Sequence, residues 1–363
     1  MKNYPLHLHA LATLVDPAVW IGIDAHKSSL SVTVLNAARE IVERATVENK
    51  HAAVTALFKK YQQYKVTAVY EAGPTGYQLL RWLREMGIDA FMTAPSLVPS
   101  ASGDRVKTDK KDSLKLATLL QGGQLKRIED LSDEEYHDRE LVRCRGRAVE
   151  ARSDICRQIK SMLLMHGIPA PEELETSWSK KAVAALKGTS SGDPLLDLVL
   201  QEEIQRFVDA DAAVQRMDKH VRALANKPKY GPTVARLETI PGIGRLSALG
   251  LATELQSMKR FRNAAALAAY LGLTPSEYSS GDRVHRGHIT RQGNSRCRAI
   301  LVEVVWRAIR QDELLAARFE ALARRRGKKR AAVALARRLA TILYAMLRDE
   351  KDWDQARVAL QAP

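Results

Sequence analysis

The first third of the chain alternates between short apolar runs and segments with helical spacing. Residues 20–24 form an apolar run that ends on Asp24, residues 30–35 alternate with a period of two, and residues 40–47 fit a third strand. Helix, strand, helix, strand and helix follow at about 51–63, 66–71, 76–86, 88–94 and 108–120. This is the element order of the ribonuclease-H-like fold, a mixed sheet flanked by helices. We therefore predict an α/β domain over residues 18–133, after a lead-in over residues 1–17.

Residues 134–233 change to a long helical pattern. Apolar residues first step by threes and fours, at Leu141, Cys144, Ala148, Ala151, Ile155, Ile159 and Met162. They then fill two heptad positions, with Leu200, Phe207, Val214 and Val221 at one and Ala210, Met217 and Leu224 at the other. The spacing predicts two arms of an antiparallel coiled coil, joined by an inserted tip at about 167–194. Such arms would support dimerisation or hold RNA; a simple intramolecular spacer is the alternative.

Residues 234–363 are predicted to form a third, mainly helical region. It opens with the segment 237–248, which resembles a helix-hairpin-helix. In that motif glycines such as Gly242 and Gly244 let backbone N–H groups approach a phosphate at a helix N-terminus. A purely structural turn is the alternative interpretation. Further along, Ser279 and Ser280 fall in a predicted loop with many basic residues, among them Arg283, Arg286 and Arg291, and Arg296 and Arg298 follow on a predicted helix.

The charge of the chain indicates a polyanionic partner. The formal net charge is +15 with a pI of about 9.7. Residues 234–363 carry 24 Lys and Arg against 12 Asp and Glu, and 20 of the 24 are Arg, which suits bidentate phosphate contacts. Nucleic acid is the predicted partner before a membrane, and a basic surface kept for solubility is the alternative.

Cysteine usage and hydropathy indicate the compartment. Cys144, Cys156 and Cys297 are scattered and form no CxxC pair, which fits a reducing cytoplasm and argues against structural zinc. No signal peptide is recognisable, and no apolar run approaches the roughly 20 residues of a membrane span. We expect a soluble, cytoplasmic protein with no membrane partner.

Four carboxylates are candidates for a metal site. Asp24 and Glu71 end predicted strands, and Asp109 and Asp112 are three residues apart, so they share a face of a predicted helix. Close carboxylates repel unless a cation lies between them, and Mg²⁺ prefers such oxygen ligands. Two ions, Mg²⁺ or Mn²⁺, would activate an attacking oxygen and stabilise a leaving one. Each Asp taken alone is more often a helix cap or a surface charge.

Several other polar residues lie near these carboxylates or near the basic loop. Lys27 and Lys107 would contact the scissile backbone, although charge balance explains them equally well. A serine such as Ser279 or Ser280 attacks a phosphodiester when its proton is removed and the developing charge is neutralised. Two serines in a polar loop are, however, most often plain loop residues.

The ordered set of motifs resembles a known family. The motifs are Gly22-Ile-Asp24-Ala-His-Lys27, Glu71-Ala-Gly-Pro-Thr-Gly76-Tyr77, Lys107-Thr-Asp109-Lys-Lys-Asp112, Ile240-Pro-Gly-Ile-Gly244, Tyr278-Ser-Ser-Gly281 and Gly287-His-Ile-Thr-Arg-Gln-Gly293. Over about residues 18–350 they resemble the DEDD transposases of insertion sequences, the bridge-RNA-guided serine recombinases with a RuvC-like N-terminal domain. Each motif alone is weak, and their common order makes the resemblance specific.

The resemblance implies a function and a set of roles. Asp24, Glu71, Asp109 and Asp112 match the metal-binding positions, and the serine before glycine, Ser280, matches the nucleophile, with Ser279 as the alternative register. A noncoding bridge RNA would pair with donor and target DNA. The active complex would be a tetramer built from two dimers, with composite sites, in a prokaryotic cytoplasm at the nucleoid. The longer N-terminal lead and the insert at 167–194 depart from the family pattern.

Two other functions remain open at this point. A metal-dependent nuclease of the junction-resolvase type would use water in place of serine. A non-catalytic nucleic-acid-binding derivative of a transposase would bind without needing the carboxylates. All three functions require nucleic acid as the partner.

Overall fold

The protein is described from a computed structural model that covers residues 18–73, 75–99, 109–128, 131–280 and 283–356. The side chains of residues 109–110, 176, 278–280, 283–286 and 355–356 are not described, and the predicted lead-in over residues 1–17 lies outside the described part. The chain divides into two compact units, residues 1–130 and residues 131–363. Each unit is treated by itself below.

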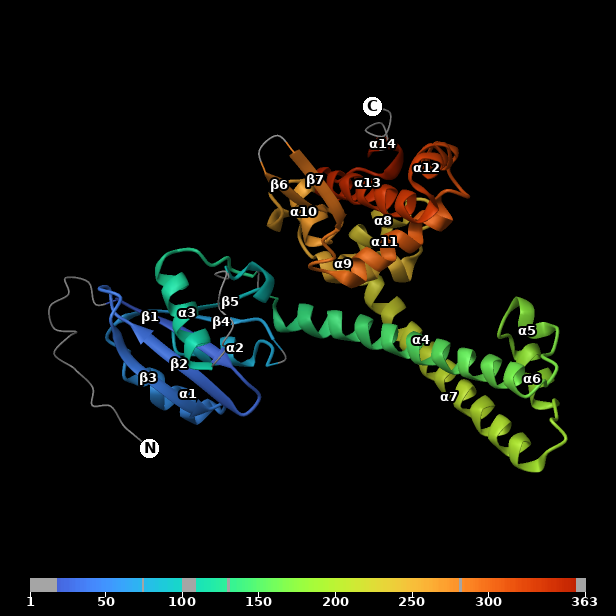
Figure 1. Cartoon of the computed structure of the whole chain (residues 1–363), viewed down its shortest axis with the longest axis horizontal. Helices are drawn as coiled ribbons and strands as arrows, with labels where there is room; N and C mark the ends of the chain where they lie inside the picture. The colour runs from blue at the N-terminus through green and yellow to red at the C-terminus, as the bar shows by residue number, and fades with distance from the viewer. Residues whose placement is uncertain (1–17, 74, 100–108, 129–130, 281–282, 357–363) are drawn as a thin grey trace. The chain divides into compact units, whose positions relative to one another are not determined.

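Five strands of the first unit form one mixed sheet (Figure 1). They are β1 (Ala18–Ala25), β2 (Ser29–Leu35), β3 (Ile41–Glu48), β4 (Lys65–Glu71) and β5 (Asp89–Thr93), in the spatial order β3-β2-β1-β4-β5. β1, β2 and β3 form an antiparallel meander, whereas β4 and β5 run parallel to β1. The sequence-based prediction of a mixed α/β sheet is confirmed.

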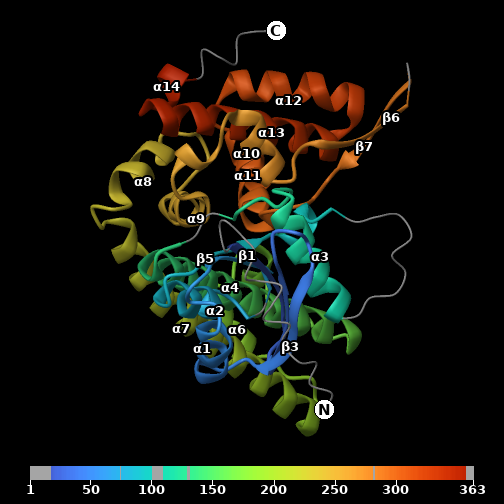
Figure 2. The same ribbon diagram turned by 90° about the vertical axis from the view of Figure 1, so that its left-hand side faces the viewer.

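Helices cover both faces of this sheet (Figures 1 and 2). α1 (His51–Lys59) and α2 (Gln78–Glu85) share one apolar cluster with the β1 residues Val19, Ile21 and Ile23. α3 (Asp109–Gln121) packs on the opposite face, where its buried Leu116 and Leu120 meet Val69 and Phe91 and the flanking Trp20. Alternate residues of β1 thus face opposite layers, as the period of a strand requires. A 3₁₀ turn at Pro95–Leu97 follows β5.

A glycine allows α3 to lie directly on β1. A Cβ atom at Gly22 would stand 2.2 Å from the carbonyl oxygen of Ser113 and 2.4 Å from the amide nitrogen of Ala117. Any side chain at this position would therefore push the helix away from the sheet. A buried hydrogen bond of 2.9 Å between the hydroxyl groups of Thr33 and Ser113 fixes the same contact.

The second unit begins with the helix pair α4 (Asp133–Met165) and α7 (Pro194–Ala225), which cross as Figure 1 shows. The pair is antiparallel, because Arg145 bonds Asp218 at 2.8 Å and Arg152 bonds Asp211 at 2.6 Å. Two short helices, α5 (Glu173–Thr176) and α6 (Lys180–Lys187), lie in the connection, and α6 contributes Leu186 to the apolar cluster between the arms.

The predicted apolar seam of the arms is only partly correct. Ile155 and Ile159 are buried, but Cys144 and Ala151 are exposed. In that stretch the two arginine–aspartate pairs join the helices instead. Cysteine and alanine have little apolar surface to bury, and the longer arginine side chains bridge the gap.

The remaining helices form one compact core. They are α8 (Gly231–Glu238), α9 (Arg245–Leu255), α10 (Ala264–Tyr270), α11 (Ser295–Ala308), α12 (Glu313–Arg326), α13 (Lys328–Asp349) and α14 (Trp353–Ala356), with a 3₁₀ turn at Met258–Arg260. α9 is buried along residues 248–255, and α13 contributes Leu335, Leu339 and Leu343. No helix in the described ranges is long and apolar enough to cross a membrane.

The prediction of a basic loop after residue 275 is wrong. Residues 275–289 form an antiparallel hairpin of β6 (Pro275–Ser280) and β7 (Arg283–Ile289), which we call the serine hairpin. The high polarity of the segment indicated a loop, and the strand pairing shifts register between Pro275 and Glu277, so no strict period of two marks these strands.

Candidate active site

Asp24 and Glu71 occupy adjoining positions at one edge of the sheet. In the parallel pairing of β1 with β4, Ile23 lies opposite Tyr70, so the next residue of each strand is one of the two carboxylates. Neighbouring strands are about 5 Å apart. Asp24 is two residues after Gly22, and Glu71 is two residues after Val69, so both lie on the sheet face that α3 covers. We call this place the acidic edge.

The direction of α3 brings its first turn to the acidic edge. Ser113 lies over Gly22, and the Gln121 side chain at the other end of α3 donates to the carbonyl oxygen of Asn36 at 3.0 Å. Asn36 follows β2 at the end of the sheet where β1 begins. α3 therefore runs antiparallel to β1, so Asp112 lies toward the end of β1 that carries Asp24.

Polar contacts surround the acidic edge. The Asp24 carboxylate is 3.2 Å from Nε2 of His26, and its side chain is 22% exposed. Glu71 is exposed and Asp112 is half-buried. Lys27 is exposed in the turn between β1 and β2. The side chain of Asp109 and all of Lys107 lie outside the described residues. Within the described part of the chain, no group of three His, Cys, Asp or Glu is close enough to hold a metal ion.

The turn after Glu71 is held by a buried tyrosine. The Tyr70 hydroxyl group donates to the carbonyl oxygen of Gly76 at 2.9 Å, and Gly76 has a φ of +61°. The Gly76 amide also donates to the Gly73 carbonyl oxygen at 3.1 Å. The predicted glycine-containing motif after Glu71 is therefore a closed turn, which keeps the chain entering α2 next to the acidic edge.

The serine hairpin places both candidate nucleophiles at its tip end. Ser279 pairs with Val284, and Ser280, the last residue of β6, pairs with Arg283. The hairpin belongs to the second unit and the acidic edge to the first.

The predicted phosphate-binding arginines fall into different environments. Arg291 is exposed just after β7, with a φ of +56°. Arg298 instead donates to the carbonyl oxygen of Leu271 at 2.8 Å, and burial, together with the nearby charge of Arg291, lowers the pKa of its guanidinium group. Arg296 lies against Gly146 of α4. Arg283 and Arg286 are on β7, and their side chains are not described.

The segment predicted as a helix-hairpin-helix forms α8, a turn and α9. Gly242 has a φ of +83°, and a Cβ there would lie 2.9 Å from the Ala308 amide nitrogen, so packing against α11 explains this glycine. Gly244 is the N-cap of α9, has open space around it and makes no side-chain cap. A cavity of about 320 Å³ lies beside this turn and is lined by Gly242, Ser247, Ala299, Ile300, Glu303, Val304 and Arg307. Phosphate contact at Gly244 stays a prediction.

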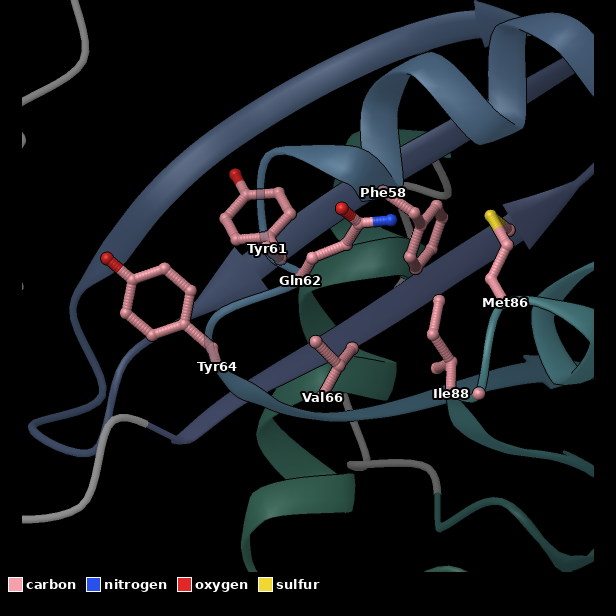
Figure 3. A pocket seen from close by; sticks show the side chains of 8 residues that line it. Phe58, Tyr61, Gln62, Tyr64, Val66, Met86 and Ile88 are labelled. Atoms are coloured by element: carbon pink, nitrogen blue, oxygen red, sulfur yellow. The ribbon is translucent and has the colours of Figure 1, made fainter.

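A smaller cavity in the first unit is not part of the acidic edge. Figure 3 shows the side chains of Phe58, Tyr61, Val66 and Met86 around it, and its volume is about 80 Å³. Val66 is near the start of β4 and Glu71 is at its end, so the two places are about 17 Å apart along the strand. This cavity has no carboxylate in its lining and is too small for a nucleotide.

Two family models of transposases match the chain. The DEDD transposase model of IS110 elements covers residues 21–167, from β1 to α4. The model of the transposase IS116/IS110/IS902 family covers residues 234–320, from α8 into α12. The first match contains Asp24, Glu71 and Asp112, and the second contains the serine hairpin.

Whole-chain relatives agree with these matches. The putative transposase y4qE of Sinorhizobium fredii is 31% identical over 92% of this chain and 89% of its own length. The chain belongs to the IS116/IS110/IS902 family of transposases. A probable family 20 transposase of Pseudomonas aeruginosa is 26% identical over 91% of this transposase and 97% of its own length. The transposase for insertion sequence element IS1533 of Leptospira borgpetersenii is 26% identical over 68% of this transposase and 72% of its own length.

Membership of a DEDD family implies that this transposase depends on a divalent metal. The residue types at the acidic edge suit such an ion, because Asp24, Glu71 and Asp112 all offer carboxylate oxygens, the ligands that Mg²⁺ and Mn²⁺ prefer. The described side chains alone do not form a complete ligand set, and the side chain of Asp109 lies outside them.

Two residues with notable contacts were not predicted from the sequence. His26 lies two residues after Asp24 and contacts it. Its place in the turn directly after β1 was a signal for this contact. Glu254 is buried at 2% exposure in α9, among arginines of α4. No local pattern signals Glu254, because its arginine partners are more than 100 residues earlier in the chain and Asn294 is 40 residues later.

Proposed function

We propose that the transposase excises and inserts its own insertion sequence through a serine attack on DNA, guided by a noncoding bridge RNA. The observation that carries the proposal is the adjoining position of Asp24 and Glu71, with the first turn of α3 at the same edge, in a chain whose family-matched C-terminal region presents Ser279 and Ser280 on a hairpin.

The carboxylates and the serine have different roles in the proposed reaction. Asp24, Glu71, Asp109 and Asp112 hold two divalent cations, which supply charge to stabilise the attacking and leaving oxygens when bound. Ser280 is the nucleophile: its oxygen forms a bond to phosphorus, and its proton passes to a carboxylate of the acidic edge. The bond from phosphorus to one sugar oxygen breaks, and that oxygen leaves as a free hydroxyl end after taking up a proton.

The basic residues hold the nucleic acids. Arg283, Arg286 and Arg291 lie on or beside the serine hairpin, where guanidinium groups suit bidentate phosphate contacts. Lys27 is next to the acidic edge, and we propose that Lys107 joins it. Gly242 and Gly244 at the turn before α9 form a further phosphate contact. Arg296 and Arg298 act on the nucleic acid indirectly, through α4 and the turn at Leu271.

The nucleophile and the acidic edge are in different units, which suits a composite site. We propose that a dimer, and a tetramer in the active complex, combines the acidic edge of one subunit with the serine hairpin of another. Donor and target DNA are recognised by pairing with the RNA, while the protein contacts mainly backbone.

A covalent-adduct assay tests the proposal. The protein is expressed with its flanking DNA, denatured and captured, and attached DNA is measured for wild type, Ser279→Ala, Ser280→Ala and Asp24→Asn. We expect an adduct in wild type and in Ser279→Ala, and none in Ser280→Ala or Asp24→Asn, with nucleic-acid binding retained in all four. Loss of the adduct only in Ser279→Ala would identify Ser279 as the nucleophile.

The same assay separates the other two functions. Cleaved DNA with no adduct in any sample would establish a nuclease that uses water, for which the acidic edge alone suffices. Tight binding unaffected by loss of the carboxylates, with no cleavage in wild type, would establish a non-catalytic binding protein. Sequencing of RNA that copurifies with wild type tests the guide: no enriched RNA from the element would contradict it.

A further inference from the structure

A buried carboxylate in the second unit joins three elements. Glu254 of α9 is 2% exposed. Its two oxygens accept from Nε and NH2 of Arg143 at 2.7 and 3.0 Å, and Oε2 also accepts from the Asn294 amide group at 2.8 Å. Arg143 belongs to α4, and Asn294 is the N-cap of α11. We call these three residues the Glu254 node.

The Asn294 side of the node is the base of the serine hairpin. The backbone amide of Asn294 donates to the carbonyl oxygen of Tyr270 at 2.8 Å, and the side-chain oxygen of Asn294 caps α11 by accepting from the Cys297 amide at 3.0 Å. The Thr290 amide, just after β7, donates to the Thr274 carbonyl oxygen, just before β6, at 2.8 Å. A displacement of Asn294 would therefore displace the segments that lead into β6 and out of β7.

Close backbone packing makes this base rigid. A Cβ on Gly293 would stand 2.0 Å from the carbonyl oxygen of Tyr270, and a Cβ on Gly272 would stand 2.2 Å from that of Gln292. Both glycines have a positive φ. The two turns at 270–273 and 290–294 are therefore pressed together, and Glu254 holds one of them through Asn294.

The other side of the node is α4, the first helix of the second unit. Besides Arg143, Arg139 of α4 donates to the backbone carbonyl oxygens of Thr253 and Glu254 at 3.1 and 3.3 Å. α4 begins at Asp133, directly after the chain leaves the unit that carries the acidic edge. α4, at the start of the second unit, is thus hydrogen-bonded to Glu254, which also bonds Asn294 at the hairpin base.

We propose that Glu254 is a positioning residue that fixes the serine hairpin relative to α4. Among the described residues, its carboxylate accepts from both Arg143 and Asn294. Its loss therefore weakens the hold on the hairpin base while leaving the nucleophile and the acidic edge chemically intact. The effect on DNA attack rests on the proposed function, whereas the effect on the hairpin base does not.

The test uses the full chain with Glu254→Gln as the main variant. The glutamine side chain keeps the size but turns an NH₂ group toward the donors of Arg143 or Asn294. We expect adduct formation, measured well below the melting temperature, to slow by about tenfold or more, since small misplacements of a reacting group have effects of this size. We also expect faster hydrogen exchange at the amides of Thr290 and Asn294.

Two further variants keep the test decisive if Glu254→Gln folds poorly. Asn294→Ser keeps a capping side chain for α11 but loses the amide donor to Glu254, so it slows the adduct by a smaller factor. The double variant Glu254→Gln/Asn294→Asp restores the pair between positions 254 and 294, because glutamine now donates to aspartate, and it recovers part of the lost rate. The contact with Arg143 is not restored, because Oε2 also accepts from Arg143.

Asp138→Asn is the matched control. Asp138 is also a buried carboxylate involving α4, but it accepts from the Tyr230 hydroxyl group at 3.0 Å, before α8, and has no bond to the hairpin base. We expect it to lower the melting temperature without slowing adduct formation or changing exchange at Thr290 and Asn294.

The outcomes separate positioning from plain stabilisation. Equal slowing by Glu254→Gln and Asp138→Asn, or unchanged exchange at the hairpin base in Glu254→Gln, would overturn the proposal. If wild type forms no adduct, the serine mechanism fails, and the exchange measurement alone then decides whether Glu254 holds the hairpin.

Discussion

The acidic edge and the serine hairpin both carry candidate site residues at strand ends, but their strands are supported differently. β1 and β4 lie in the middle of a five-stranded sheet with helices on both faces, and α3 rests on β1 through Gly22 and apolar side chains. The serine hairpin has two strands only, and a two-stranded hairpin is marginal by itself. Its base is held by buried polar groups around Glu254.

This difference separates two ways of fixing a reactive group. At the acidic edge, close packing sets the distance between helix and sheet, so added volume is the main threat. At the hairpin, close packing of the turns at its base is combined with hydrogen bonds to a buried charge, so loss of a partner or of that charge is an additional threat. Removal of a buried charge should therefore disturb the base of the serine hairpin more than the contact of α3 with β1.

The largest expected effect is that of Gly22→Ala. The new methyl group would stand 2.2 Å from the Ser113 carbonyl oxygen, which is backbone and cannot move without α3. We expect a loss of about 3 kcal/mol in the free energy of unfolding of the first unit, measured by denaturant titration. DNA cleavage should also be lost, because the first turn of α3 carries Asp112.

Gly122→Ala is the control for this prediction. Gly122 follows α3, and a Cβ there would meet its nearest neighbour at an ordinary 3.5 Å. We expect a neutral or slightly stabilising effect, since alanine restricts the unfolded chain more than glycine does. Equal losses from the two substitutions would show that close packing of α3 is not what supports the acidic edge.

Much of the first unit was predictable from the sequence. The strand ending at Asp24 and the strand ending at Glu71 follow from short apolar runs, and Asp24 and Glu71 end up side by side because their strands are parallel neighbours. Periodicity alone did not reveal that Gly22 is the contact point of α3. That role depends on a helix about 90 residues later in the chain, and a single glycine in a strand has several explanations.

The second unit was less predictable, for two physical reasons. The serine hairpin is short and polar, so its alternation was weak against the turn-like composition around Ser279 and Ser280. The Glu254 node depends on partners from two distant segments, and an isolated glutamate in a helical pattern resembles a surface charge. The roles of the predicted site residues stay predictions until the adduct assay is done.

A smaller effect is expected from Thr33→Val, which tests a polar contact inside the packed unit. Thr33 and Ser113 are 0% and 1% exposed, and valine keeps the shape of threonine while removing its hydroxyl group. The Ser113 hydroxyl group then loses this hydrogen bond, which costs about 1 kcal/mol. The free energy of unfolding measures this loss.

The double variant Thr33→Val/Ser113→Ala completes a thermodynamic cycle. The cycle isolates the free energy of the hydrogen bond between the two hydroxyl groups, which we expect to be about 1 kcal/mol. Additive losses in the double variant would mean that the two hydroxyl groups act independently, and that α3 is seated by volume alone.

The last prediction concerns the charge of Glu254, whose contribution to stability changes on acidification. Burial by itself raises the pKa of this carboxyl group, but hydrogen bonds from Arg143 and Asn294, with the charges of Arg143 and Arg139, outweigh burial and hold the pKa below its ordinary value of 4.5. The folded state thus binds the proton less readily than the unfolded state. The stabilisation is complete above pH 4.5 and is lost as the pH falls through the folded pKa.

This pH dependence is measured as the stability of α9 by hydrogen exchange in the full chain, in wild type and in Glu254→Gln. We expect the stability of wild-type α9 to fall more steeply below pH 4.5 than that of the variant, which has no carboxylate to protonate. The difference between the two curves isolates Glu254 from the other acidic groups that titrate in the same range. Parallel curves would mean that the charge of Glu254 does not support the hairpin base, and that both regions of the molecule depend on packing alone.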